Sequence, residues 1–449
     1  MAFGDGSRGA LGVATGAVDA DGDAWTPRPV EGLSTIERPR AIACGHYHSL
    51  LAPHEGGVWA WGRDSEGQAS GETVPGRPSP RCPAPVPGLV DICGAPDDPV
   101  ARLAAGAFLS IGVLASGRLV AWGQRTAHGH GVGANAAAGA AGALASVAPA
   151  HLTLPRGGPR GALAADGPTE ARAAGVAAGW GHALAWGAGP DVGAVWGWGL
   201  ASGGRLGAPV PPRGEAAWPG PAVVAAALPI DAHASPWAGA ACGLDHSLLL
   251  TGGGTVLSLG DPRTCLHGQL GRDAGGAGGE GGGAVASAAA ATAFPAGAVE
   301  PPLPACRAIA CGLGHSLAVS HCGREVWAWG WGAAGQLGEP RPGPGEDDAP
   351  PDDARTPRRV PIPPLDRGVT VRSVAAGRGH SAALLSDGRL LTWGSRRAGR
   401  LGRGRALLSF GDDEGGAGWD APGFVETPGR VVDLACGWDH TLIVVEIAG

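Results

Sequence analysis

The sequence has no lysine, so all 33 of its basic residues are arginine. This absence excludes mechanisms that depend on a lysine amine, such as a Schiff-base intermediate or the phosphate-binding lysine of a P-loop. The formal net charge of −7 is small for 449 residues. It gives no general attraction to nucleic acid or to an anionic membrane, so any such contact would need a local basic patch.

Targeting signals are also missing from this sequence. The first twelve residues lack the basic and then apolar stretches of a secretory signal, and the longest alanine-rich run, around residues 284–294, is too short to span a bilayer. The nine cysteines include no Cys-x-x-Cys pair. We therefore expect a reducing intracellular location, cytoplasmic or nuclear, and no membrane partner.

Glycine and proline, in contrast, are abundant. With 83 and 40 residues they make up about a quarter of the chain, a level typical of low-complexity sequences. Sixteen tryptophans and a hydrophobic fraction of 44% argue against disorder, because they are enough to bury a sizeable core. Glycine at this density then indicates many turns between short strands.

A six-residue string, [A/C]-G-x-x-H-[S/T], occurs seven times with small variations, for example as CGLGHS from Cys311. We call its glycine the anchor glycine. One copy has Leu109 where the others have histidine. The anchor glycines, 60 to 73 residues apart, are Gly45, Gly106, Gly179, Gly243, Gly312, Gly377 and Gly437.

Two further strings follow the anchor glycine. The glycine of the first, as in VWAWG ending at Gly330, comes 17 to 20 residues after each of the first six anchor glycines, and its tryptophans are expected to pack between repeats. A third string, G-[Q/R]-L-G, follows in four repeats. A hairpin lies between the first two strings, clearest at the Ser386–Arg389 turn. Each repeat therefore predicts four short antiparallel strands, the blade of a β-propeller.

The seventh repeat breaks off soon after Gly437, and the N-terminus supplies what it lacks. Ala2-Phe3-Gly4 corresponds to the second string, and Gly9-Ala10-Leu11-Gly12 corresponds to the third. The last blade is thus expected to be shared by both chain ends, at about residues 1–30 and 430–449. This arrangement closes the ring and leaves no strand edge or blade face exposed.

The three strings together resemble the regulator of chromosome condensation repeat family, whose members fold as seven-bladed propellers. We therefore predict an all-β, seven-bladed β-propeller that forms one domain over residues 1–449 and is a monomer. Insertions at about residues 124–172, 261–304 and 339–357 are predicted to be loops.

No catalytic, metal or cofactor site is predicted. A histidine that recurs in each repeat has the same role in each, such as bonding turn backbone within its blade. Four cysteines exchange with alanine before the anchor glycine, which indicates small buried side chains. The other five have no ligand-like spacing and are unassigned. The histidines are His48, His182, His246, His315, His380 and His440, and the unassigned cysteines are Cys82, Cys93, Cys265, Cys306 and Cys322.

Two matches to known binding motifs are rejected because the neighbouring residues do not fit the motif. Residues 330–335 fit the GxGxxG dinucleotide pattern, but Pro340 follows and no helix is predicted there to hold a pyrophosphate. Asp19, Asp21 and Asp23 have the spacing of a calcium loop, but its glycine is displaced and no glutamate closes it.

Binding residues are expected where an otherwise constant string varies, because the blade does not dictate them. We call the two residues after each anchor glycine the first and second turn positions. Aromatic residues and arginine there are typical of binding hot spots, although rim packing would explain some of them equally well. The candidate partner-binding face comprises His46, Tyr47, Phe108, Trp180, Asp245, Arg378, Trp438 and Asp439.

A second candidate is the densest basic cluster in the chain. It could be a solvated loop, or it could meet an anionic partner surface. Its members are Arg396, Arg397, Arg400, Arg403 and Arg405.

Three functions remain open, none of them bond-making chemistry. The favoured one is a scaffold that binds a protein partner. Resemblance to the founding member of the family implies the second, guanine-nucleotide exchange on a small Ras-like GTPase, which needs no catalytic triad. Resemblance to a plant relative implies the third, a UV-B photoreceptor. That resemblance predicts Trp-Arg pairs in several consecutive blades, whereas this chain has only Trp180-Gly181 and Trp438-Asp439, in separated blades.

Overall fold

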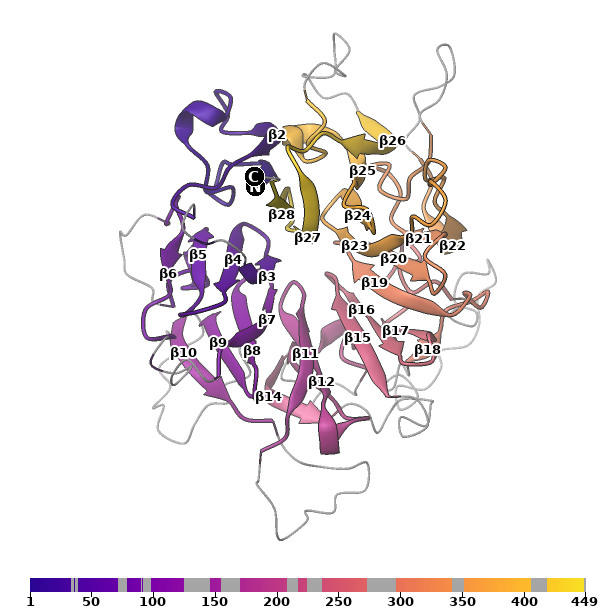
Figure 1. Cartoon of the computed structure of the whole chain (residues 1–449). Helices are drawn as coiled ribbons and strands as arrows, with labels where there is room; N and C mark the ends of the chain where they lie inside the picture. Colours follow the sequence, from indigo (N-terminus) through magenta and orange to yellow (C-terminus); the bar gives the residue numbers. More distant parts are fainter. Residues whose placement is uncertain are drawn as a thin grey trace.

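The computed structural model describes residues 1–33, 36, 39–71, 79–89, 91, 98–124, 146–154, 170–207, 217–223, 236–272, 296–340, 351–404 and 418–447. These residues form seven four-stranded antiparallel sheets arranged in a ring around a central axis (Figure 1). The predicted all-β, seven-bladed propeller is therefore confirmed.

The first four blades follow one another along the chain, each running from an inner strand to an outer one. Their strands are β3 (Pro39–Cys44), β4 (His48–Pro53), β5 (Trp59–Gly62) and β6 (Ala84–Pro85) in blade 1; β7 (Val100–Ala105), β8 (Leu109–Leu114), β9 (Leu119–Gln124) and β10 (Ser146–Leu152) in blade 2; β11 (Ala173–Ala178), β12 (His182–Gly187), β13 (Val195–Leu200) and β14 (Ala217–Val223) in blade 3; and β15 (Trp237–Cys242), β16 (His246–Thr251), β17 (Val256–Gly260) and β18 (Gly297–Ala298) in blade 4.

Blades 5 and 6 repeat this order, and blade 7 uses both ends of the chain. Their strands are β19 (Cys306–Cys311), β20 (His315–Ser320), β21 (Val326–Gly330) and β22 (Ala354–Arg359) in blade 5; β23 (Val371–Ala376), β24 (His380–Leu385), β25 (Leu390–Ser395) and β26 (Trp419–Val425) in blade 6; and β27 (Arg430–Cys436), β28 (His440–Glu446), β1 (Ala2–Gly4) and β2 (Ala24–Arg28) in blade 7.

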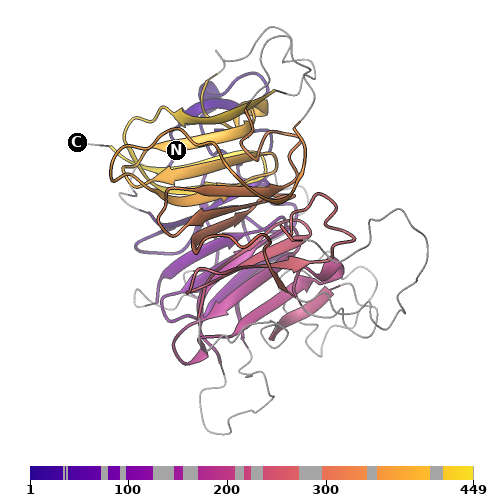
Figure 2. The same cartoon turned by 90° about the vertical axis from the view of Figure 1, so that its right-hand side faces the viewer.

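The ring closes in blade 7 as the sequence predicts. Strand β1 pairs with β28, with Phe3 opposite Thr441, and β2 pairs with the other edge of β1. Phe3 is fully buried in a hydrophobic cluster to which blades 1, 6 and 7 contribute. Both views show the first and last strands of the chain side by side in this blade (Figures 1 and 2).

The repeat strings take fixed places in each blade. The anchor turn, which begins at the anchor glycine, joins the innermost strand to the second, and the second string forms the third strand. Because the strands alternate in direction, the anchor turns and the third strings lie on one face of the ring, which we call the anchor face. The hairpin turns, such as Ser386–Arg389 between β24 and β25, lie on the opposite face.

The predicted loop boundaries need correction, because each of the three insertions contains an outer strand. Strand β10 lies within residues 124–172, β18 lies within 261–304, and β22 begins within 339–357. The sequence does not predict these strands because their own residues carry no clear strand pattern. Their sequences, SVAPAHL, GA and ARTPRR, lack the regular alternation that marks a strand.

The core lies between neighbouring blades, and tryptophans of the second string fill it. Trp61, Trp122, Trp329 and Trp393 are fully buried. The glycine that ends the string is required by backbone geometry. Gly330 has a φ of 102°, and a Cβ there would lie 2.4 Å from the carbonyl oxygen of Gly314.

Candidate functional site

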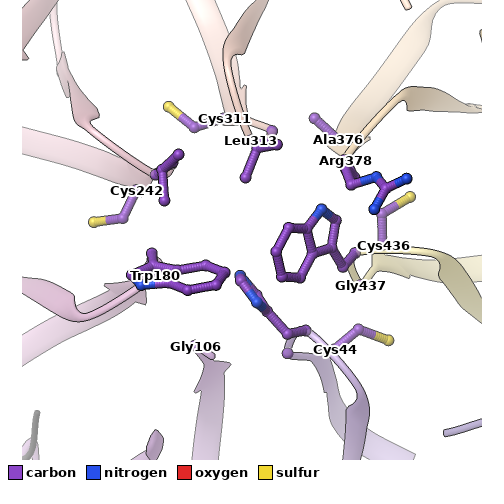
Figure 3. A pocket seen from close by; sticks show the side chains of 18 of the residues that line it. Cys44, Gly106, Trp180, Cys242, Cys311, Leu313, Ala376, Arg378, Cys436 and Gly437 are labelled. Atoms are coloured by element: carbon purple, nitrogen blue, oxygen red, sulfur yellow. The ribbon is translucent and has the colours of Figure 1, made fainter. Parts of the chain in front are cut away.

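A ring of backbone hydrogen bonds connects all seven blades at the axis. The amide of each first turn position donates to a carbonyl of the next blade, from His46 to Gly106 at 3.2 Å round to Trp438, which bonds Gly45 at 3.3 Å. The ring fixes the first turn positions at the anchor-face mouth of the central channel (Figure 3). The donors are His46, Ala107, Trp180, Leu244, Leu313, Arg378 and Trp438.

Aromatic rings from four blades meet at this mouth. The His46 ring centroid lies 3.8 Å from that of Trp438 and 4.4 Å from that of Trp180, and the two indoles are 5.0 Å apart and nearly perpendicular. Tyr47 lies 5.6 Å from Trp438, and Phe108 lies 5.5 Å from Trp180. We call these five residues the axial cluster. Trp180 and Trp438 belong to separated blades, as the sequence indicates, but they touch across the narrow channel.

The axial cluster is uncharged and only partly covered. Burial lowers the pKa of His46 to about 3, so its imidazole is neutral at physiological pH. All five side chains remain partly accessible. The channel behind them retains a cavity of about 80 Å³, enough for a few water molecules. Arg378 adds a cation beside the cluster, with its Cζ 5.8 Å from the Trp438 ring.

The two acidic residues of the candidate partner-binding face, Asp245 and Asp439, form salt bridges within the protein. Arg205 Nη2 lies 2.7 Å from Asp245 Oδ1, and Arg400 Nη1 lies 2.8 Å from Asp439 Oδ1. In each pair the arginine belongs to the third string of one blade and the aspartate to the second turn position of the next. Asp439 is 4% exposed, so it presents little surface to a partner. These contacts tie one blade to the next.

The sequence carried a signal for these pairs that our reading missed. Where the third string contains arginine, the next blade has aspartate at its second turn position. Where it contains glutamine, at Gln269 and Gln336, the next blade has Gly314 and Gly379. The glutamine turns back on its own loop, since Gln336 Oε1 accepts a hydrogen bond from the Ala334 amide at 2.9 Å. Comparing these two positions blade by blade would have assigned Asp245 and Asp439.

The recurring histidines join blades, which corrects the predicted role within one blade. His315 Nε2, for example, lies 3.0 Å from the Ser381 hydroxyl of the next blade. Ser381 in turn donates to the carbonyl of Gln336, in the third string of the preceding blade. The six pairs, at 2.8–3.1 Å, are His48–Ser110, His182–Ser247, His246–Ser316, His315–Ser381, His380–Thr441 and His440–Ser49.

One blade junction lacks this contact, and both partners are replaced there. Leu109 stands in the histidine position of blade 2, and Ala183 stands in the facing serine position of blade 3. Both are fully buried. Exchanging both members of a buried hydrogen bond for apolar groups leaves no unsatisfied donor, so the junction can form without the pair.

The cysteines before the anchor glycines surround the channel, with their sulfurs pointing away from its centre (Figure 3). Burial raises the pKa of Cys242 and Cys436 to about 12, and that of Cys44 and Cys311 rises as well. These thiols are therefore protonated and poor nucleophiles. Of the unassigned cysteines, Cys265 and Cys306 are buried, Cys82 and Cys322 are exposed, and Cys93 lies outside the described residues.

The basic cluster is mostly engaged within the protein. Arg396 and Arg400 are 6% and 5% exposed, and Arg403 lies 3.1 Å from Asp420, which is also 3.8 Å from Arg396. Of the four arginines of this cluster that the structure describes, only Arg397 is exposed. Arg405 lies outside the described residues.

Comparison with known proteins agrees with this geometry. Residues 2–52, 325–384 and 387–444 match the model of the Regulator of chromosome condensation (RCC1) repeat, and residues 371–399 match a second model of that repeat. RCC1 repeats thus occur in these parts of the chain. The first match runs from β1 to β4, so it includes the strand that closes the ring.

Curated relatives match only part of this RCC1-repeat chain. The Ultraviolet-B receptor UVR8 of Arabidopsis thaliana is 34% identical over 96 residues, 21% of this chain and 19% of the receptor. The probable E3 ubiquitin-protein ligase HERC6 of Homo sapiens is 34% identical over 175 residues, 38% of this chain and 14% of the ligase. The matches thus span less than a fifth of either relative.

Among solved structures, Prp20p from Saccharomyces cerevisiae has the same fold. The two chains superimpose with a TM-score of 0.70 at 19% identity, over 98% of this chain and 90% of Prp20p. Prp20p has been described with its binding properties to Gsp1p and histones. In the described part of the RCC1-repeat chain, no helix is long and apolar enough to cross a membrane.

Proposed function

We propose that this RCC1-repeat propeller is an interaction scaffold that binds a protein partner on its anchor face, through the axial cluster. The observation that carries the proposal is the meeting of His46, Trp180 and Trp438 at the channel mouth, with ring centroids 3.8–5.0 Å apart. Tryptophan, tyrosine and arginine are the residues most enriched among binding hot spots.

Blade packing alone does not require aromatic residues at these positions. The same ring of first turn positions contains Ala107, Leu244 and Leu313, which make the same backbone hydrogen bonds to the next blade. The indoles of Trp180 and Trp438 therefore add apolar area where a smaller side chain would complete the ring. That surplus, partly open to solvent, supports a role in recognition.

The proposal is tested by capturing partners with the full chain and comparing variants on the two faces. Trp180→Leu and Trp438→Leu copy the residues that already occupy the ring in blades 4 and 5, so the blades should still fold. We expect each variant to weaken binding of the captured partner about tenfold or more, which corresponds to a hot-spot residue.

Phe424→Leu provides the matched control, because Phe424 is an aromatic residue on the opposite face, 40% exposed beside Arg389. It should leave binding unchanged. A partner that binds both tryptophan variants as tightly as the wild-type chain, or that is lost with Phe424→Leu, would show that the axial cluster is not the binding site. Thermal unfolding of each variant checks that the fold is intact.

Guanine-nucleotide exchange on a small Ras-like GTPase is the second candidate, supported by the RCC1 repeats and by the fold shared with Prp20p. It predicts that the chain accelerates release of fluorescent GDP from at least one member of a panel of such GTPases, and that Trp180→Leu or Trp438→Leu reduces the acceleration. Unchanged release rates across the panel would reject nucleotide exchange and leave the scaffold as the only proposed function.

The UV-B photoreceptor is not proposed, because its indoles would need arginine neighbours. The two indoles touch, but Arg378 is the only arginine among the described residues that lies over either ring.

A further inference from the structure

A pocket of about 200 Å³ opens on the anchor face between blades 5 and 6, beside the axial cluster. Three connections form it: the chain after β21, the anchor turn of blade 6, and the two ends of the connection between β25 and β26. Its walls include the indoles of Trp331 and Trp419, and its polar lining comes from Arg378, Arg397, Arg400 and Ser395.

The charge of this pocket is unbalanced. Arg378 and Arg400 share one carboxylate, since Asp439 Oδ1 lies 2.8 Å from Arg400 Nη1 and 3.7 Å from Arg378 Nε. Within the part of the chain that the structure describes, the Arg397 guanidinium has no acidic or hydrogen-bonding partner. The lining thus carries three arginines and no acidic residue, and the carboxylates that act on Arg400, those of Asp439 and Asp5, lie outside the lining.

The lining also has more hydrogen-bond donors than acceptors. The guanidinium groups of Arg378, Arg397 and Arg400 supply these donors. The lining hydroxyl of Ser395 lies 3.4 Å from the amide of Arg397. A site with free donors, excess positive charge and indole walls that limit access of water suits a ligand that carries acceptors and negative charge.

The backbone beside Arg397 is held in an unusual conformation. Ala398 has a φ of 55°, in the left-handed region that residues other than glycine rarely adopt. The corresponding residue in blade 3 is Gly203, with a φ of 72°. The buried side chain of Arg400 supports this turn, because its Nε donates to the Arg397 carbonyl at 2.8 Å. Strain kept in place by a buried contact is common where a turn presents a binding group.

We propose that this pocket binds the carboxylate of an aspartate or glutamate in an acidic segment of the protein partner. Arg397 and Arg378 donate to the carboxylate, and Arg400 and Asp439 hold them in position. The volume admits one side chain rather than a larger ligand. The inference rests on the proposed function, which it extends by naming the chemistry of the partner: a partly acidic surface that covers the axial cluster and places a carboxylate beside Trp331.

A model peptide tests this site without the natural partner. The probe is a fluorescein-labelled dodecapeptide in which glutamates alternate with glycine and serine, and its control has glutamine in place of each glutamate. By fluorescence anisotropy at 50 mM salt, we expect the glutamate peptide to bind about tenfold more tightly than the glutamine peptide. Arg397→Gln and Arg378→Gln should each remove most of that difference.

Arg367→Gln is the matched control, because Arg367 is an exposed arginine in the connection from blade 5 to blade 6 on the opposite face. Equal binding of the two peptides, or equal losses with Arg367→Gln and Arg397→Gln, would overturn the carboxylate site. Trp180→Leu should leave the glutamate peptide bound. Loss of the natural partner with Trp180→Leu, together with equal binding of the two peptides, would therefore retain the axial cluster and reject only the pocket.

Discussion

At the scale of single residues, recurrence predicted correctly that the histidines share one role, but not which role. The pattern [A/C]-G-x-x-H-[S/T] places histidine and serine side by side in the sequence, which suggests a contact within one turn. The structure instead pairs the histidine of one blade with the serine or threonine of the next. No sequence spacing reports this contact, because the partners are 61 to 70 residues apart in five pairs and 391 apart in His440–Ser49, and they meet only once the ring is assembled.

The pair of Leu109 and Ala183 suggests a direct test of this contact. Ser381→Ala should reduce the free energy of unfolding by about 1–3 kcal/mol, because it leaves the buried Nε2–H of His315 without an acceptor. The double variant His315→Leu with Ser381→Ala reproduces the natural apolar pair and should recover most of the loss. Urea denaturation of the wild-type chain and of each variant measures both values. A double variant less stable than Ser381→Ala would contradict the account.

At the scale of strands and turns, the repeat strings predicted the three inner strands of each blade well. The outer strands and the loop partners were harder to predict. Strand β18 has only two residues, Gly297 and Ala298, and its pairing with β17 is set by the neighbouring strand rather than by its own sequence. Charge density alone predicts a basic cluster that includes Arg400, because it does not reveal that Asp439 of the next blade neutralises this side chain.

The residue in the third string of one blade corresponds to the residue at the second turn position of the next blade. We therefore predict that the Arg–Asp pair of one junction can be replaced by the Gln–Gly pair of another. Asp439→Gly should cost about 3–5 kcal/mol of unfolding free energy, because it leaves Arg400 buried without its counter-charge. Arg400→Gln combined with Asp439→Gly copies the pair of Gln336 and Gly379 and should restore most of that stability. The measurement is a double-mutant cycle in urea. Additive losses would mean that the two side chains do not interact.

At the scale of the whole molecule, the six inter-blade histidines make stability depend on pH. Burial lowers the pKa of His48, His246 and His315 from 6.5 to about 3, and that of His440 to about 4. The pKa values of His182 and His380 also fall well below 6.5. Because the unfolded chain takes up these protons first, their contribution is complete above pH 6.5 and is lost as the pH falls toward 3.

Each of these histidines should lower the free energy of unfolding by about 2 kcal/mol at pH 5, relative to neutral pH. Six together approach the whole stability of an ordinary domain, so we expect cooperative unfolding between about pH 5 and 4. Tryptophan fluorescence during an acid titration follows it. The double variant His315→Leu with Ser381→Ala should unfold at a lower pH than the wild-type chain, and an unchanged midpoint would contradict the assignment.

The closed ring and the identity of its mouth residues could be read from the strings, whereas the contacts at that mouth depend on the ring radius. Trp180 and Trp438 lie more than 250 residues apart in the sequence, yet seven inner strands bring their ring centroids to 5.0 Å from each other.

The central claim is that the anchor-face mouth of the channel receives the partner. Hydroxyl-radical footprinting of the full chain, with and without its captured partner, tests it directly. We predict that bound partner protects Trp180, Trp438 and Tyr47 and leaves Phe424 unchanged. Protection of Phe424, with unaltered oxidation of both tryptophans, would place the partner on the opposite face and contradict the claim.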